Sequence, residues 1–105
     1  MANTFKNFFS KDVSSNTVVY TAAAATQTTV IGMTIANVLT SPVTANIVIN
    51  SGGTDFFMLK EATIPAGGAL VPVGGEQKLV LEATDSLAIS ATGNCDVILS
   101  VLEIT

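Results

Sequence analysis

The chain has 105 residues, of which 49% are hydrophobic and only 11% charged, and its net charge at pH 7 is -4. A chain of this length forms one domain around one core, and its surface must be largely neutral, since soluble domains usually carry roughly a quarter charged residues. There is no His, Arg or Trp, and the four lysines form no basic stripe; we therefore expect neither an enzyme nor a nucleic-acid-binding protein.

The N-terminal segment, residues 1–16, holds three of the five phenylalanines, Phe5, Phe8 and Phe9. Their i, i+3, i+4 spacing could place them on one face of a helical turn, but a segment this short is marginal alone. It must dock on its own domain or on a neighbouring subunit, and both alternatives stay open. We predict an N-terminal arm over 1–16 and a folded domain over 17–105.

Beyond the arm, large apolar residues recur at every second position, which is typical of strands with one buried face. Breakers such as Ser41-Pro42, Ser51-Gly52-Gly53 and Gly93-Asn94 interrupt these runs every eight to twelve residues. The pattern predicts eight strands, near 17–21, 28–38, 43–50, 55–63, 69–73, 78–82, 86–92 and 95–103. We expect an all-β fold, a single antiparallel β-sandwich or jelly-roll-like domain.

The last two predicted strands would form a hairpin whose loop length fixes its register. A loop of odd length with a left-handed Gly93 would keep Leu87 and Ile89 on one face with Val97 and Leu99. We expect that register.

Two predicted strands are apolar on both faces, "DFFMLK" at 55–60 and "VILSVLEI" at 97–104. A sandwich buries one face of each sheet, so either the chain's own N-terminus or a second subunit must cover the other. We predict a homo-oligomer, with a trimer favoured. The expected interface residues are Phe5, Phe8, Phe9, Phe56, Met58, Ile98 and Leu102.

The charged residues between Val71 and Ser90 are Glu76, Lys78, Glu82 and Asp85. Glu82 and Asp85 could approach the spacing of a catalytic carboxylate pair, but no aromatic sugar platform accompanies them. We expect solvated loop carboxylates, with Asp85 holding backbone N–H groups in a turn.

No other chemistry is indicated. The glycine-rich turns lack the phosphate-loop pattern, and no dense run of oxygen ligands suggests calcium. Cys95, the one cysteine, cannot form an internal disulfide and is expected to be a half-buried thiol without a catalytic base. We therefore expect no cofactor and no metal.

Residues 13–54 contain no charge, yet polar and β-branched residues interrupt every window long enough for a membrane helix. No apolar signal region follows Met1. The sequence predicts a soluble protein made in the cytoplasm, with no membrane partner.

The stretch "TIPAGGALVPVGGEQKLVLEATDSLAI", with "VVYTA" before it and "VILSVLEI" at the end, resembles a family of small virion structural proteins of tailed bacteriophages, especially marine and cyanobacterial ones. The likeness covers residues 17 to 104, and the Phe-rich N-terminus has no counterpart in the family pattern. The resemblance implies a β-sandwich that assembles on the virion after synthesis in the host cytoplasm.

The role that this resemblance implies is a capsid decoration or cement subunit in contact with proteins such as the major capsid protein. A neck, collar, baseplate or tail-fibre component is the alternative. From another class, a carbohydrate-binding module stays open, although Tyr20 is the one tyrosine and Trp is absent.

Overall fold

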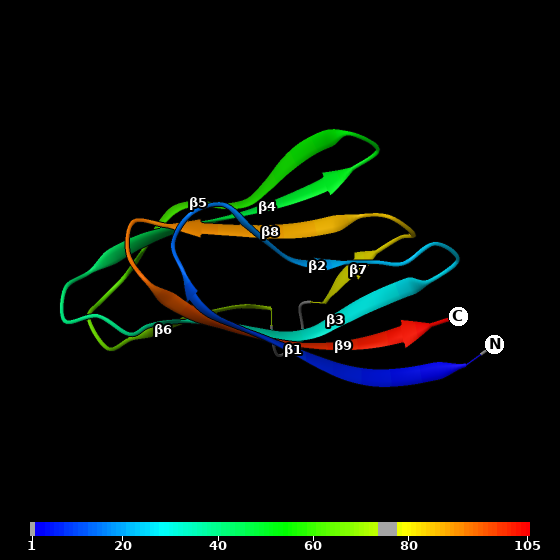
Figure 1. Ribbon diagram of the computed structural model, residues 1–105, viewed down its shortest axis with the longest axis horizontal. Coiled ribbons are helices and arrows are strands. Elements are labelled where there is room, and N and C mark those ends of the chain that lie inside the picture. Colours follow the sequence, from blue (N-terminus) through cyan, green and yellow to red (C-terminus); the bar gives the residue numbers. More distant parts are fainter. Residues whose placement is uncertain (1, 74–77) are drawn as a thin grey trace.

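The computed structural model describes residues 2–73 and 78–105, which form two antiparallel sheets packed face to face (Figure 1). One sheet has the order β1-β9-β3-β6, with β7 also pairing with β3, and the other has the order β2-β8-β4-β5. The strands are β1 (Asn3–Val13), β2 (Thr17–Thr21), β3 (Gln27–Asn37), β4 (Val43–Ser51), β5 (Thr54–Ile64), β6 (Ala69–Val73), β7 (Leu79–Leu81), β8 (Ser86–Ala91) and β9 (Cys95–Ile104). The predicted all-β sandwich is confirmed.

The strand pairing is nested, as in a jelly roll: β1 pairs with β9, β2 with β8, β3 with both β6 and β7, and β4 with β5. The two ends of the chain therefore lie side by side (Figure 1). Ala2 and Thr105 exchange two backbone hydrogen bonds, of 3.1 and 2.9 Å.

The N-terminal segment differs from the expectation, because residues 3–13 form strand β1 and no helical turn. From Asn3 to Ser10 each residue lies opposite a residue of β9 in continuous antiparallel register. The spacing of the phenylalanines is also that of a strand, with Phe5 and Phe9 on one face and Phe8 on the other. The expected boundary near residue 16 falls in the turn between β1 and β2.

The predicted register of the last hairpin is wrong, because β8 and β9 belong to different sheets. Leu87, Ile89, Val97 and Leu99 still meet in one core, but from its two sides. Gly93 has no left-handed φ. Glycine is needed here because a side chain has no room: an added Cβ would lie 2.6 Å from a methyl group of Leu39.

The core is formed by the alternating apolar residues of both sheets. Ile47 and Ile89 of one sheet and Ile35 and Leu99 of the other have no exposed surface. Their polar or small neighbours in the sequence face outward, as the period-two pattern predicts.

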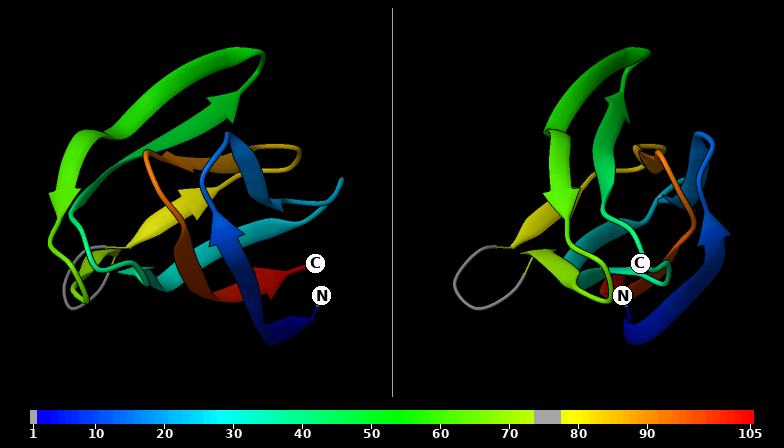
Figure 2. Two further views of the ribbon diagram at one scale, coloured as in Figure 1. Left: turned by 60° about the vertical axis from the view of Figure 1, so that its left-hand side comes forward. Right: turned by 90° about the vertical axis from the view of Figure 1, so that its left-hand side faces the viewer.

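Hairpin β4–β5 arches away from the rest of the sandwich (Figure 2). Its tip is a two-residue turn, since Ser51 lies opposite Thr54. Gly52 and Gly53 have φ angles of 62° and 84°, the left-handed conformations that a tight hairpin of this twist requires.

Candidate functional site

The outer face of the five-stranded sheet carries an apolar patch, which we call the outer strip. It consists of Phe5, Phe9, Val80, Ile98 and Leu102. Cross-strand pairing aligns these residues in two rows: Phe5, Leu102, Thr29 and Val80 form one, and Phe9, Ile98 and Thr34 the other. Phe5 is 74% exposed and Phe9 69%. Large apolar side chains gathered on one face in this way make it a candidate interaction surface.

The outer strip carries no charge of its own. Between its two rows, Asn7 lies opposite Ser100, and Ser100 opposite Gly32. At one end, Lys11 and Asp96 form an ion pair with 3.6 Å between Nζ and Oδ2. A partner that covered the strip would therefore displace water from apolar and small polar groups and would desolvate few charges.

Four of the residues predicted for the interface meet on this strip: Phe5, Phe9, Ile98 and Leu102. Val80 was not among them, although it alternates with Leu79 and Leu81, whose side chains point to the core.

Phe8, also predicted for the interface, points inward and packs against the core. Its ring meets that of Tyr20 edge to face, with 4.9 Å between the centroids. Phe8 therefore joins β1 to the sandwich and is not part of the outer strip.

The other two predicted residues lie on the four-stranded sheet and do not join the strip. Phe56, opposite Ile49 on the hairpin, is 55% exposed. Met58 is half-buried and packs against the core beside an irregularity in β5. The seven predicted interface residues therefore do not lie on one surface of the fold.

A polar network lies beside the core near the chain ends. The Tyr20 hydroxyl donates to Glu103 Oε2 at 2.6 Å and lies 2.7 Å from the Thr28 hydroxyl. Since a phenol has one proton, Thr28 must donate to Tyr20. Lys6 Nζ lies 2.9 Å from the other Glu103 oxygen. The network therefore joins strands β1, β2, β3 and β9.

The network shifts the pKa of both acidic groups. Burial and the hydrogen bond to Glu103 raise the pKa of Tyr20 to about 12. The hydrogen bonds from Tyr20 and Lys6 hold the pKa of Glu103 below its ordinary value. Both shifts favour the state seen here, a neutral phenol donating to a carboxylate, and this arrangement is structural because every member is engaged within the fold.

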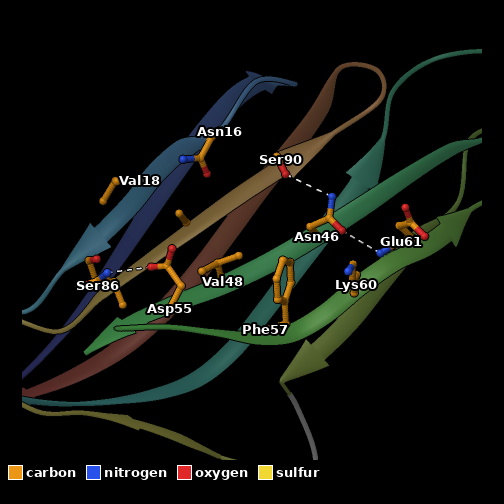
Figure 3. A pocket seen from close by; sticks show the side chains of 12 residues that line it. Asn16, Val18, Asn46, Val48, Asp55, Phe57, Lys60, Glu61, Ser86 and Ser90 are labelled. Atoms are coloured by element: carbon orange, nitrogen blue, oxygen red, sulfur yellow. Dashed lines mark hydrogen bonds between the residues drawn. The ribbon is translucent and has the colours of Figure 1, made fainter. Parts of the chain in front are cut away.

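The outer face of the four-stranded sheet is hollowed (Figure 3). This polar hollow has a volume of about 550 Å³. It is lined by Asn16, Val18, Asn46, Val48, Asn50, Asp55, Phe57, Lys60, Glu61, Ser86, Ala88 and Ser90.

The residues of the hollow are ordered in rows across the strands. An apolar row forms the floor: Val18, Ala88, Val48 and Phe57 lie opposite one another across β2, β8, β4 and β5. Polar rows flank it on both sides. One is Ser86, Asn50 and Asp55, and the other is Ser90, Asn46 and Glu61.

Hydrogen bonds fix the polar groups of the hollow (Figure 3). Asn46 accepts from the Glu61 backbone N–H at 2.8 Å and donates to Ser90 Oγ at 3.3 Å. Asn50 donates to Asp55 Oδ1 at 2.7 Å. On the floor, the Lys60 ammonium lies 5.2 Å from the centroid of the Phe57 ring.

The acidic cluster that the sequence singled out forms no site in the described residues, and Glu76 lies outside them. Asp85 is buried and accepts from the Glu82 backbone N–H at 3.0 Å. Asp85 therefore holds a backbone N–H in the turn, as predicted, but it is buried and is not the solvated loop carboxylate that the sequence predicts.

Cys95 is fully buried, more than the half-burial expected, and burial raises the pKa of its thiol. Within the described part of the chain, no group of three or more His, Cys, Asp or Glu residues is placed to hold a metal ion. The same residues include no helix that is long and apolar enough to cross a membrane.

Comparison with known proteins gives a fold and no family. No family model matches the chain, and no curated protein matches it. A solved structure of Bacillus endospore appendages, described as a novel family of disulfide-linked pili, is similar over 99% of this chain and 87% of its own. The TM-score is 0.52 and the sequence identity 16%, a level of likeness that concerns the fold.

The assignment to a bacteriophage virion is wrong on this finding. The structural neighbour is a bacterial pilus protein, neither a capsid decoration or cement subunit nor a neck, collar, baseplate or tail-fibre component. The motifs behind the assignment are turn and strand elements and include no catalytic signature. The virion location and the capsid-protein partner depended on that assignment and stay untested predictions.

Proposed function

We propose that the protein is a non-enzymatic structural subunit that associates with a second copy of itself through the outer strip. The observation that carries the proposal is the pair of cross-strand rows with Phe5 and Phe9 exposed at their ends. The fold that the chain shares with a pilus protein supports a structural role.

The charge distribution favours the outer strip as the place where a second copy binds. Two molecules that each carry a net charge of -4 repel one another, and the repulsion is least where the facing surfaces are uncharged. The outer strip is such a surface, because Asn7, Ser100 and Gly32 separate its apolar rows and Lys11 neutralises Asp96 at the end.

The energetics favour a contact in which the outer strips of two copies face each other. Burying one exposed phenylalanine contributes about 1.5–3 kcal/mol, so the two of one strip give roughly 3–6 kcal/mol. Association costs about 4–15 kcal/mol, and one strip against a featureless surface is too weak. Two strips facing each other across a two-fold axis double the gain.

Such an assembly would be held without covalent bonds. The structural neighbour belongs to pili described as disulfide-linked, whereas the single cysteine here has no exposed surface. The lack of His and the raised pKa of the Cys95 thiol support a protein without catalytic activity.

The test is the mass of the protein in solution, measured by sedimentation velocity. Wild-type protein should form pairs at micromolar concentration, and Phe9→Asp should remain monomeric. Phe57→Asp is the matched control, since Phe57 is 56% exposed on the opposite sheet. Monomeric wild-type protein, or equal loss of association in both variants, would contradict the proposal. A mass of three copies would support the trimer predicted from the sequence and contradict the two-fold contact.

A further inference from the structure

We infer that the polar hollow on the four-stranded sheet binds a linear, uncharged oligosaccharide that lies across the strands. This inference is independent of the proposed self-association, which uses the other sheet. It rests on the shape of the hollow, on the order of its side chains and on their charge.

The floor of the hollow has the form of a track. Its apolar row runs from Val18 on β2 to Phe57 on β5, across all four strands. Neighbouring strands lie about 4.8 Å apart, so the row is roughly 14 Å long. A track of this length suits several sugar rings in line better than one compact ligand.

The walls of the track supply hydrogen bonds on both sides. Same-face neighbours along a strand lie about 6.7 Å apart, which places the two polar rows roughly 13 Å from each other. A pyranose ring has C–H groups on its faces and hydroxyl groups around its edge. It can rest on the apolar floor while its hydroxyl groups meet the amides, hydroxyls and carboxylates of the two rows.

Some of these polar groups are held in fixed positions by hydrogen bonds and keep hydrogen-bonding capacity for a ligand. Asn50 donates to Asp55 Oδ1, and Asp55 Oδ2 has no hydrogen-bond partner among the described residues. Asn46 is fixed by its bonds to Glu61 and Ser90. Prior ordering of this kind lowers the entropy lost when a ligand binds.

Phe57 provides the aromatic surface against which a sugar face can pack. Its ring is on the floor, and 56% of the residue is exposed. The Lys60 ammonium lies over the ring, 5.2 Å from its centroid, as expected for a ring face that attracts positive charge. Sugar C–H groups carry partial positive charge and are attracted to the ring face for the same electrostatic reason.

The charges of the hollow favour an uncharged ligand. Asp55 and Glu61 oppose one ammonium, that of Lys60, so sulfated or uronic-acid chains would meet a net negative wall. A second copy of the protein fits poorly. The outer strip has two apolar rows around a polar one, whereas the hollow has one apolar row between two polar ones, so apolar rows would face polar ones.

The experiment is a titration of isotopically labelled protein, followed by NMR amide shifts, with two panels of oligosaccharides. One panel holds neutral linear glucans, mannans, galactans and N-acetylglucosamine oligomers, and the other holds heparin and polyuronate fragments. At least one neutral oligosaccharide should shift amides of β4, β5 and β8, and longer oligomers should bind more tightly than single sugars.

Phe57→Ala should weaken that binding by about tenfold or more, and Asp55→Ala should weaken it too. Phe9→Ala is the matched control, an exposed phenylalanine on the other sheet, and should leave the affinity unchanged. No binding of any neutral oligosaccharide at millimolar concentration would overturn the inference. Binding of the acidic panel alone, or equal losses in Phe57→Ala and Phe9→Ala, would overturn it as well.

Discussion

Replacing Phe8 with alanine tests whether β1 belongs to the sandwich, and Phe5 on the same strand supplies the control. Phe8 packs against the core and meets Tyr20 edge to face, whereas Phe5 is 74% exposed on the opposite side of β1. If the segment were a detached arm, both substitutions would leave the domain's stability unchanged. As an edge strand of the sheet, β1 should make the two substitutions differ sharply.

The magnitude follows from the contacts. Full burial of a phenylalanine contributes about 1.5–3 kcal/mol, and an edge-to-face aromatic pair adds about 0.5–1.5 kcal/mol. Because Phe8 is only partly buried, we expect Phe8→Ala to lower the free energy of unfolding by about 2 kcal/mol, which corresponds to a fall in Tm of roughly 8–10 °C. Phe5→Ala should cost less than about 0.5 kcal/mol.

Urea unfolding followed by far-UV circular dichroism gives both values, at concentrations low enough to keep the protein monomeric. Fluorescence of Tyr20, the one tyrosine in a chain without Trp, reports on the Phe8 contact separately. Equal and small losses for the two variants would refute the docking of β1 on the core.

The remaining predictions concern other parts of the fold. The folded-state pKa of Glu103 is lowered, so its stabilising contribution is complete above the unfolded-state pKa of about 4.3 and is lost as the pH falls through the folded-state pKa. Urea titrations at several pH values should therefore show that the difference in unfolding free energy between wild type and Glu103→Gln closes in acid. A difference that stays constant with pH would contradict this. Gly93→Ala should destabilise the domain by about 1–3 kcal/mol, because the new Cβ would lie 2.6 Å from Leu39 and 2.8 Å from Val43. Gly32→Ala meets nothing within 4 Å and should be tolerated, so equal melting temperatures for the two variants would count against the packing described. Cys95 has no exposed surface and a raised pKa, so iodoacetamide should modify it only in denaturant; rapid modification of the native protein, seen by mass spectrometry, would show that the thiol is accessible.

The sequence predicts the strands well because alternation and turn residues act locally. Eight of the strands begin and end within about two residues of the expected positions, and Ser51-Gly52-Gly53 marks a tight hairpin as expected. Sheet membership is a different matter. Nothing local in residues 86–104 shows that β8 and β9 enter different sheets, because that choice depends on the partners β4 and β3.

The candidate surfaces were only partly predictable for the same reason. Phe5 and Phe9 meet Leu102 and Ile98 because the first strand pairs with the last, a contact across nearly the whole chain. In "DFFMLK" the sequence shows apolar groups on both faces but not which phenylalanine faces which way. Phe57 lines the hollow because it lies opposite Val48, and Phe56 lies opposite Ile49 on the other face.

The most direct test of the self-association is to map which surface lies between two copies. A spin label on Ser100→Cys, in a Cys95→Ser background, can be mixed with isotopically labelled protein that carries no spin label. Because Ser100 lies between the two rows of the outer strip, the label should broaden amide signals of β1, β3 and β9 in the other copy. Broadening confined to the four-stranded sheet, or no broadening at concentrations where pairs are expected, would contradict the account.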